Sequence, residues 1–127
     1  MNEQSLAPLK KALGSLKLAI GQPLNEFTRD SVIQRFEYTF ELSWKNLKRF
    51  LESNAPLSDD SVKGILREAH QLKLITHIDQ WFSFHKSRNL TSHTYNADTA
   101  EEVYRDAIQL PALCDEMISE LEKKLKA

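Results

Sequence analysis

The chain has 127 residues, 41% hydrophobic and 28% charged, which is the composition of an ordinary globular protein and predicts one domain over residues 1–127. Seventeen Lys and Arg residues against 18 Asp and Glu residues give a formal net charge of −1. This balance excludes a protein that attracts nucleic acid through its overall charge. Contact with RNA would need a local basic cleft, which a second subunit would complete, and no binding to DNA is expected.

The sequence favours the cytoplasm and argues against a membrane or secreted protein. Cys114 is the only cysteine, so no disulfide can form within the chain. Lys10, Lys11 and Lys17 interrupt the first apolar segment, which is therefore not expected to be a signal peptide. No run of about 18 apolar residues suggests a membrane-spanning helix.

The first two predicted helices are separated by a turn over residues 21–25. Apolar residues at steps of three and four predict a helix over residues 6–20. We expect Thr28 or Asp30 to cap the next helix, which Pro56 and the residues before it should end. The apolar ladder of that second helix comprises Ile33, Phe36, Phe40, Trp44, Leu47 and Leu51.

Two shorter helices are predicted next. A third helix over roughly residues 59–72 is expected to be capped by Ser58. A short segment over residues 73–77 joins it to a fourth helix, which contains Trp81 and continues into a polar stretch. The predicted inward positions of the third helix are Val62, Ile65, Leu66, Ala69 and Leu72.

The last predicted helix begins near Asp98, because the sequence from Asp98 to Glu101 resembles a capping box. Pro111 should kink this helix or make the chain start another. No segment alternates apolar and polar residues as a strand would. The fold class is therefore all-α, an antiparallel bundle of about five helices.

The large apolar residues and Cys114 are expected in the bundle core. Trp44 and Trp81 at a dimer interface remain an alternative. Common catalytic patterns are missing: there is no glycine-rich phosphate loop, no GxSxG and no HExxH. The four histidines lack the spacing of a zinc site, so neither a metal nor a cofactor is predicted. His70, His77 and His85 are expected at the surface or at helix ends.

The polar stretch is "SRNLTSHTYN", residues 87–96, and it contains Arg88, His93 and Tyr95. A continuous helix would place Arg88 and Tyr95 on nearly the same face, with His93 about 140° away from Arg88 around the axis. Arg88 and His93 could then converge only if the helix breaks or if a second subunit contributes. The Ser, Thr and Asn side chains of the stretch favour a break, because they bond readily to nearby backbone groups.

Arginine and histidine together suit phosphodiester chemistry. Arg88 can bind a phosphate through two hydrogen bonds, and His93 can transfer a proton near neutral pH. In the simpler alternative, Arg88 pairs with a carboxylate and His93 caps a helix. Glu37 and Glu41, one helical turn apart, could line the cleft or contact this motif, or they could belong to a solvated or salt-bridged face.

Two blocks in this order, "RDSVIQRFEYTFELSWKNLKRFLE" at residues 29–52 and "SRNLTSHTYN" at 87–96, resemble the HEPN proteins encoded beside minimal nucleotidyltransferases. The resemblance continues through "REAHQLKLI" at residues 67–75 and "LPAL" at 110–113. These proteins have also been called nucleotidyltransferase substrate-binding proteins. The resemblance implies a helical bundle that forms a homodimer around an R-x4-6-H motif.

In the HepT-like toxin branch, the motif implies metal-independent RNA cleavage, here by Arg88 and His93. The same branch implies that the partner nucleotidyltransferase, the antitoxin, neutralises the toxin by transferring AMP from ATP to a tyrosine, here Tyr95. Asn89 and Ser92 lie inside the motif and are expected to support it. Two alternatives remain: a non-catalytic subunit that binds a nucleotide or substrate for the nucleotidyltransferase, and a helical scaffold without chemistry.

Overall fold

The structure is a computed structural model and describes residues 1–126. Within this range it contains α-helices and short 3-10 helices but no strand, so the predicted all-α class is confirmed. The elements are η1 (Glu3–Leu6), α1 (Ala7–Ile20), α2 (Glu26–Asn54), α3 (Val62–Gln71), α4 (Ile78–Asn89), η2 (Thr91–His93), α5 (Ala97–Ala107) and α6 (Leu110–Lys126).

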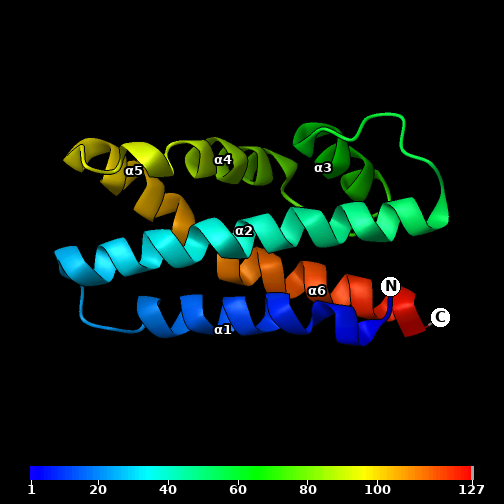
Figure 1. Cartoon of the computed structure of the whole chain (residues 1–127), viewed down its shortest axis with the longest axis horizontal. Coiled ribbons are helices and arrows are strands. Elements are labelled where there is room, and N and C mark those ends of the chain that lie inside the picture. The colour runs from blue at the N-terminus through cyan, green and yellow to red at the C-terminus, as the bar shows by residue number, and fades with distance from the viewer. Residues whose placement is uncertain (127) are drawn as a thin grey trace.

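The long helix α2 runs through the middle of the molecule (Figure 1). Helices α1 and α6 lie along one side of it, whereas α3, α4 and part of α5 lie on the other (Figure 1). The two ends of the chain are close together, and Lys126 Nζ lies 3.4 Å from Glu3 Oε1. Among residues 1–126, no helix has the length and apolar character that a membrane crossing needs.

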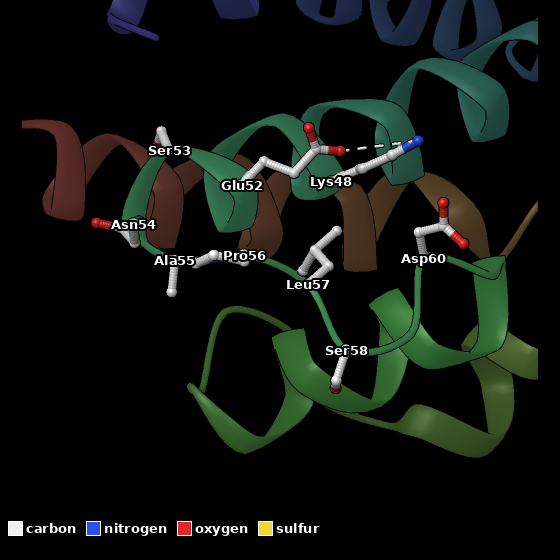
Figure 2. A pocket seen from close by; sticks show the side chains of 9 residues that line it. All are labelled: Lys48, Glu52, Ser53, Asn54, Ala55, Pro56, Leu57, Ser58 and Asp60. Carbon is white, nitrogen blue, oxygen red and sulfur yellow. Dashed lines mark ion pairs between the residues drawn. The ribbon is translucent and has the colours of Figure 1, made fainter.

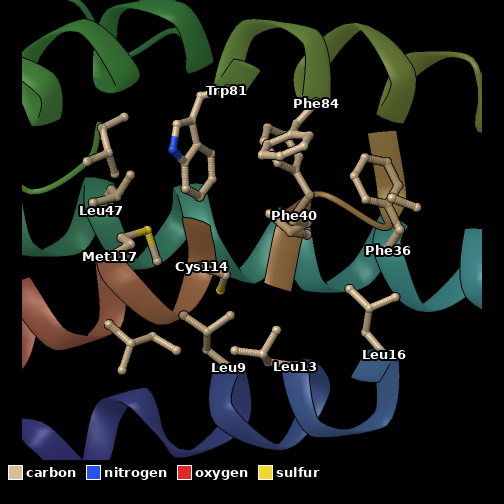
Figure 3. Close-up of a cluster of buried hydrophobic side chains, with 14 of the residues drawn as sticks. Leu9, Leu13, Leu16, Phe36, Phe40, Leu47, Trp81, Phe84, Cys114 and Met117 are labelled. Atoms are coloured by element: carbon tan, nitrogen blue, oxygen red, sulfur yellow. The ribbon is translucent and has the colours of Figure 1, made fainter. Parts of the chain in front are cut away.

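The apolar ladder of α2 forms the centre of the core (Figure 3). Phe36 and Phe40 are fully buried, and the ring centroid of Phe40 lies 6.3 Å from that of Trp81 on α4. Phe84 packs edge-on against Trp81 at 5.3 Å. Trp81 has no exposed surface, so its alternative placement at a dimer interface is wrong. Trp44 is half-buried and packs against the edge of the core.

Cys114 behaves as the expected buried apolar residue. It lies in the core on α6, with its Sγ 3.5 Å from Ser43 Oγ. Burial raises the pKa of its thiol to about 12, because a thiolate would lose its hydration there. The thiol is therefore uncharged at neutral pH and is not a candidate nucleophile.

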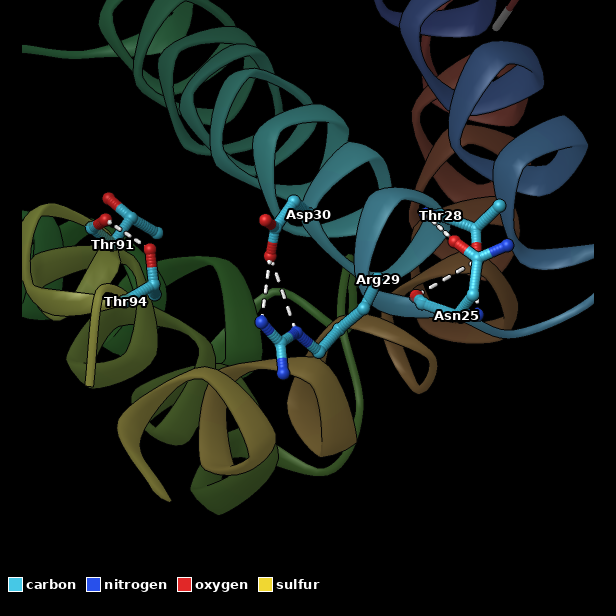
Figure 4. Close-up of polar contacts among 6 residues, drawn as sticks. All are labelled: Asn25, Thr28, Arg29, Asp30, Thr91 and Thr94. Carbon is cyan, nitrogen blue, oxygen red and sulfur yellow. Dashed lines mark hydrogen bonds and ion pairs between the residues drawn. The ribbon is translucent and has the colours of Figure 1, made fainter. Parts of the chain in front are cut away.

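The predicted starts of the second and third helices are wrong by three to five residues. Asn25, not Thr28 or Asp30, caps α2: its Oδ1 accepts from the Thr28 backbone N–H at 3.0 Å, and Thr28 Oγ1 accepts from the Asn25 N–H at 2.8 Å (Figure 4). Ser61, not Ser58, caps α3. The capping geometry chooses among neighbouring polar residues that all favour helix starts.

The end of the third helix and the start of the fifth also differ from prediction. Helix α3 ends at Gln71, so the next residue, Leu72, is 48% exposed and does not point inward. Asn96 caps α5 through its Oδ1, which accepts from the backbone N–H groups of Asp98 and Thr99. Near Pro111 the chain starts another helix, α6, which is one of the two outcomes predicted for this proline. Pro111 lies in the first turn of α6, where its missing N–H removes no helical hydrogen bond.

Candidate functional site

The polar stretch breaks the helix, as its composition predicts. Helix α4 ends at Asn89, the 3-10 turn η2 follows, and α5 begins at Ala97. Thr91 Oγ1 donates to the Arg88 carbonyl at 2.8 Å, and Thr94 Oγ1 donates to the Thr91 carbonyl at 3.1 Å (Figure 4). These bonds satisfy carbonyls that a continuing helix would have used. Arg88 and Tyr95 are therefore not on the face of one continuous helix.

Arg88 is bound to acidic side chains of α2. Its Nε donates to Glu41 Oε1 at 2.5 Å, and its Nη2 lies 3.9 Å from Glu37 Oε1. These carboxylates contact the motif and form salt bridges at the same time, so both expectations for them are met, and Arg88 has the carboxylate partner that the simpler alternative expected. Lys45 shares Glu41 at 3.7 Å. Because the side chain of Arg88 is 33% exposed, the pair lies at a surface and not in the core.

His93 and Tyr95, which follow Arg88 in the polar stretch, are both exposed. Tyr95 is 87% exposed, and its ring centroid lies 6.3 Å from that of His93 at an interplanar angle of 71°. Neither side chain has a hydrogen bond to another group within residues 1–126. His93 does not cap a helix, since Asn96 has that role, and its imidazole is free to meet a substrate. Asn89 and Ser92 are also exposed.

Tyr95 and Arg88 lie against different positions along α2. Tyr95 lines a hollow of about 440 Å³ with Glu26, Arg29 and other residues near the start of α2. Arg29 forms an ion pair with Asp30 at 3.2 Å (Figure 4). Arg88 instead contacts Glu37 and Glu41, and eight residues from Arg29 to Glu37 span about 12 Å of helix axis.

Asp106 of α5 binds three side chains of α4, a contact that the sequence did not predict. Its carboxylate accepts from Gln80 Nε2 at 3.0 Å, Ser83 Oγ at 2.7 Å and Ser87 Oγ at 2.5 Å. The three donors follow one another at steps of three and four along α4, so they share one face. These three polar residues at helical spacing were the sequence feature that could have indicated a polar contact on this face of α4. This cluster fixes α4 against α5 directly before Arg88.

His85 differs from the other histidines of the helical region. His70 and His77 are exposed at helix ends as expected, but His85 is half-buried and stacks at 6.2 Å on Phe40. Its Nδ1 is buried without a hydrogen-bond partner among the described residues. Burial, then the positive charges of Lys63 and Arg88, lower the pKa of His85. Its imidazole is therefore neutral at neutral pH.

Other parts of the surface offer less chemistry. A hollow of about 860 Å³ at the end of α2 contains Lys48, which lies 3.7 Å from Glu52, and no residue of the motif (Figure 2). In the described part of the chain, no three His, Cys, Asp or Glu side chains come close enough together to hold a metal ion. The motif therefore remains the candidate site.

Residues 4–123 match the family model described as "Nucleotidyltransferase substrate binding protein like". The chain belongs to this family. The match includes all four sequence blocks that carry the resemblance, and the resemblance is thereby confirmed. It also contains the whole candidate site, from Glu37 to Tyr95.

Two solved structures of similar fold support this assignment. A crystal structure from Thermus thermophilus matches 89% of this chain and 98% of its own, with 34% identity and a TM-score of 0.80. A Haemophilus influenzae structure matches 91% of this chain and 98% of its own, with 31% identity and a TM-score of 0.81. The second is described as revealing the fold of a substrate binding domain of a nucleotidyltransferase.

A curated relative is named for an activity. Over 76 residues the chain is 43% identical to a Haemophilus influenzae protein called "Probable ribonuclease HepT". The aligned segment is 57% of this chain, and the chain spans about half the length of that relative, 52%.

In this chain the candidate residues form two separate pairs. Arg88 is joined to Glu41, and His93 lies beside Tyr95. No hydrogen bond or ion pair connects the side chains of Arg88 and His93 within residues 1–126. The chain therefore presents the two groups without a direct bond between them.

Proposed function

We propose that this chain is a metal-independent endoribonuclease and the toxin of a toxin–antitoxin pair. The observation that carries the proposal is the free, exposed imidazole of His93, five residues after the fixed guanidinium of Arg88 and on the scaffold of this family. The relative named as a probable ribonuclease supports the same conclusion. Because RNA and ATP would be the substrates of the pair, the proposal includes a cytoplasmic location.

The proposed reaction is an attack of a ribose 2′-oxygen on the adjacent phosphorus. His93 takes the 2′-hydroxyl proton or protonates the leaving 5′-oxygen, the P–O5′ bond breaks, and a 2′,3′-cyclic phosphate remains. Arg88 stabilises the negative charge that grows on the phosphoryl oxygens. Since Glu41 binds the Nε edge of the guanidinium, other N–H groups can still bind phosphate.

One imidazole performs only one of the two proton transfers, so the proposed active form is a homodimer in which two copies of the motif face one cleft. The distance along α2 between the positions of Arg88 and Tyr95 supports a site shared by two copies. Light scattering that finds only monomers at the concentrations of the activity assay would contradict this part of the proposal.

Incubation of the purified protein with RNA in excess EDTA tests the proposed activity. The wild-type protein is expected to cleave RNA to products with 2′,3′-cyclic phosphate ends, without a metal ion. Its expression without the partner should arrest growth. An unmodified wild-type protein that leaves RNA intact and growth unchanged would contradict the proposal.

Tyr95 is the proposed site at which the partner minimal nucleotidyltransferase adds AMP from ATP, with loss of pyrophosphate. Its 87% exposure leaves the hydroxyl accessible to another protein. AMP on Tyr95 would put negative charge beside His93 and repel an RNA phosphate. Intact mass should increase by one or more AMP groups with partner and ATP, and Tyr95→Phe should remove this increase. Tyr38→Phe, at a 40% exposed tyrosine outside the motif, is the matched control.

Glu41 is a proposed positioning residue for Arg88. Glu41→Ala removes the acceptor of the Arg88 Nε bond, and we expect RNA cleavage to fall about tenfold because the guanidinium loses its fixed orientation. Glu41→Gln keeps an acceptor oxygen and should restore most of the rate. Cleavage that rises in both variants would instead mean that Glu41 keeps Arg88 away from RNA. The rate is measured at saturating RNA, which separates positioning from binding.

The second candidate function is a non-catalytic subunit that binds a nucleotide or substrate for the nucleotidyltransferase. The family description and the similar Haemophilus influenzae structure favour it, as does the neutralisation of Arg88 by carboxylates. This candidate predicts a tight complex with the nucleotidyltransferase and no RNA cleavage by the unmodified protein.

A further inference from the structure

A third hollow, of about 540 Å³, lies between α3 and α4 beside the motif. Helix α4 supplies most of its walls, and Asn89, a motif residue, stands at its end. The side chains that matter for its chemistry are Lys63, Asp79, Phe82, His85, Lys86 and Asn89. The hollow thus extends from the candidate site across a surface that the proposed chemistry does not use.

The hollow has an excess of positive charge. Lys63 and Lys86 are exposed, and neither has a carboxylate within ion-pair distance among the described residues. Asp79 is the one acidic side chain in its lining, and His85 is neutral at neutral pH. Two lysines without a salt bridge are available to an anion, whereas the charge of Arg88 is already shared with two glutamates.

An aromatic ring fixes part of this charge. Lys63 Nζ lies 5.9 Å from the centroid of the half-buried Phe82 ring, and Arg67 Cζ lies 5.6 Å from it. A cation over an aromatic face is attracted to it and loses part of its freedom. Phe82 therefore holds Lys63 at the hollow before any ligand arrives, while Arg67 contacts the same ring from outside the lining.

Helical spacing aligns the hollow with the motif. Phe82, Lys86 and Asn89 follow one another at steps of four and three, which puts them on one face of α4 over about 10 Å. The chain then turns into η2 with Ser92 and His93. A strand bound along this face would reach the exposed imidazole at the end of the helix.

We propose that this hollow binds the sugar–phosphate backbone of single-stranded RNA next to the cleaved bond, with Lys63 and Lys86 contacting phosphates and Asn89 leading the strand into the motif. This inference rests on the proposed ribonuclease function and adds a substrate-binding surface to it. The overall charge of −1 makes such a local surface necessary, because the whole molecule does not attract RNA.

Fluorescence anisotropy with a labelled single-stranded oligoribonucleotide of about 12 residues, in a His93→Ala background that prevents cleavage, tests the proposal. Reversing both charges, Lys63→Glu with Lys86→Glu, should weaken binding tenfold or more. In the milder double variant, Lys63→Gln with Lys86→Gln, the slope of log affinity against log salt should become shallower by about 1.4, since each lost phosphate contact removes about 0.7. Phe82→Leu should weaken binding several-fold because the cations lose the ring.

The matched control is Lys11→Glu with Lys124→Glu. These exposed lysines lie on α1 and α6, on the other side of α2, and change the net charge equally. Equal affinity loss in the hollow and control variants would overturn the binding surface and leave the ribonuclease proposal intact. A protein partner in the hollow would leave RNA affinity at the wild-type level, which also overturns it. If no variant binds RNA, and the protein that carries only His93→Ala does not bind it either, both proposals are overturned.

Discussion

His93→Ala is expected to lower the rate of RNA cleavage by about 10²- to 10⁴-fold, the usual contribution of a positioned general acid or base. The reason is local: the imidazole is exposed, has no hydrogen bond within the described residues, and is the proposed proton-transferring group of the motif. Its removal should leave the fold unchanged, because an exposed side chain without partners contributes little to stability. The measurement is the single-turnover cleavage rate of a labelled RNA.

His77→Ala is the matched control for this prediction. His77 is also exposed, but it lies at the start of α4, at the other end of the helix from the motif. Its left-handed backbone, with φ of 55°, makes the control sensitive to folding errors, so the thermal midpoint is measured in parallel. His70→Ala serves as a second control in a regular helix. Equal cleavage by His93→Ala and the wild type would remove His93 from the proposed chemistry.

Arg88 needs a more careful substitution than His93. Arg88→Ala would leave Glu37 and Glu41 without their shared cation, so lost cleavage could result from a local rearrangement of α2 and α4. Arg88→Lys keeps the charge but lacks the planar set of donors that binds phosphate. We expect cleavage to fall in both variants, with Arg88→Lys keeping the melting temperature near that of the wild type.

The helices were predictable because their core positions repeat. Phe36, Phe40 and Leu47 follow the helical period, and all three are fully buried. Helix starts were less predictable, because several residues that favour N-caps occur close together. Asn25, Thr28 and Asp30 all suit the position, and the backbone geometry of residue 25 decides among them.

The candidate site was predictable only in its local part. Serine, threonine and asparagine side chains indicated the break after Asn89, because their bonds to nearby backbone groups are local. The ion pair between Glu41 and Arg88 joins residues 47 positions apart in the sequence. It forms only if α4 packs on α2 at the position along the helix axis that brings these two side chains together. The burial of the His85 side chain likewise depends on how α4 packs against other helices.

Packing between distant helices also determines the stability of the site. Asp106 on α5 accepts three hydrogen bonds from α4, and Trp81 on α4 reaches the core ladder of α2. Both contacts fix α4 along its length before the break at Asn89. The polar motif consequently follows a helix, α4, that is held by both α5 and α2. The residues of the motif do not indicate these contacts.

Trp81→Ala is expected to lower the free energy of unfolding by about 3–5 kcal/mol, the usual cost of deleting a large buried aromatic side chain. Trp81 is fully buried, and its ring lies 5.3 Å from Phe84 and 6.3 Å from Phe40, so its removal leaves a cavity between α2 and α4. Urea unfolding followed by circular dichroism, at one protein concentration, measures the effect.

Two further variants test whether lost packing is the cause of the lower stability expected for Trp81→Ala. The Trp81 Nε1 is buried without a hydrogen-bond partner among the described residues, so Trp81→Phe sacrifices no hydrogen bond and removes an unpaired donor. It should cost clearly less than Trp81→Ala, because the phenyl ring fills part of the cavity that alanine leaves. Phe27→Ala, at an aromatic residue that is 83% exposed, should change stability by no more than about 0.5 kcal/mol. A cost for Trp81→Ala as small as that for Phe27→Ala would contradict the burial of Trp81 in the core, and with it the anchoring of α4 that positions Arg88.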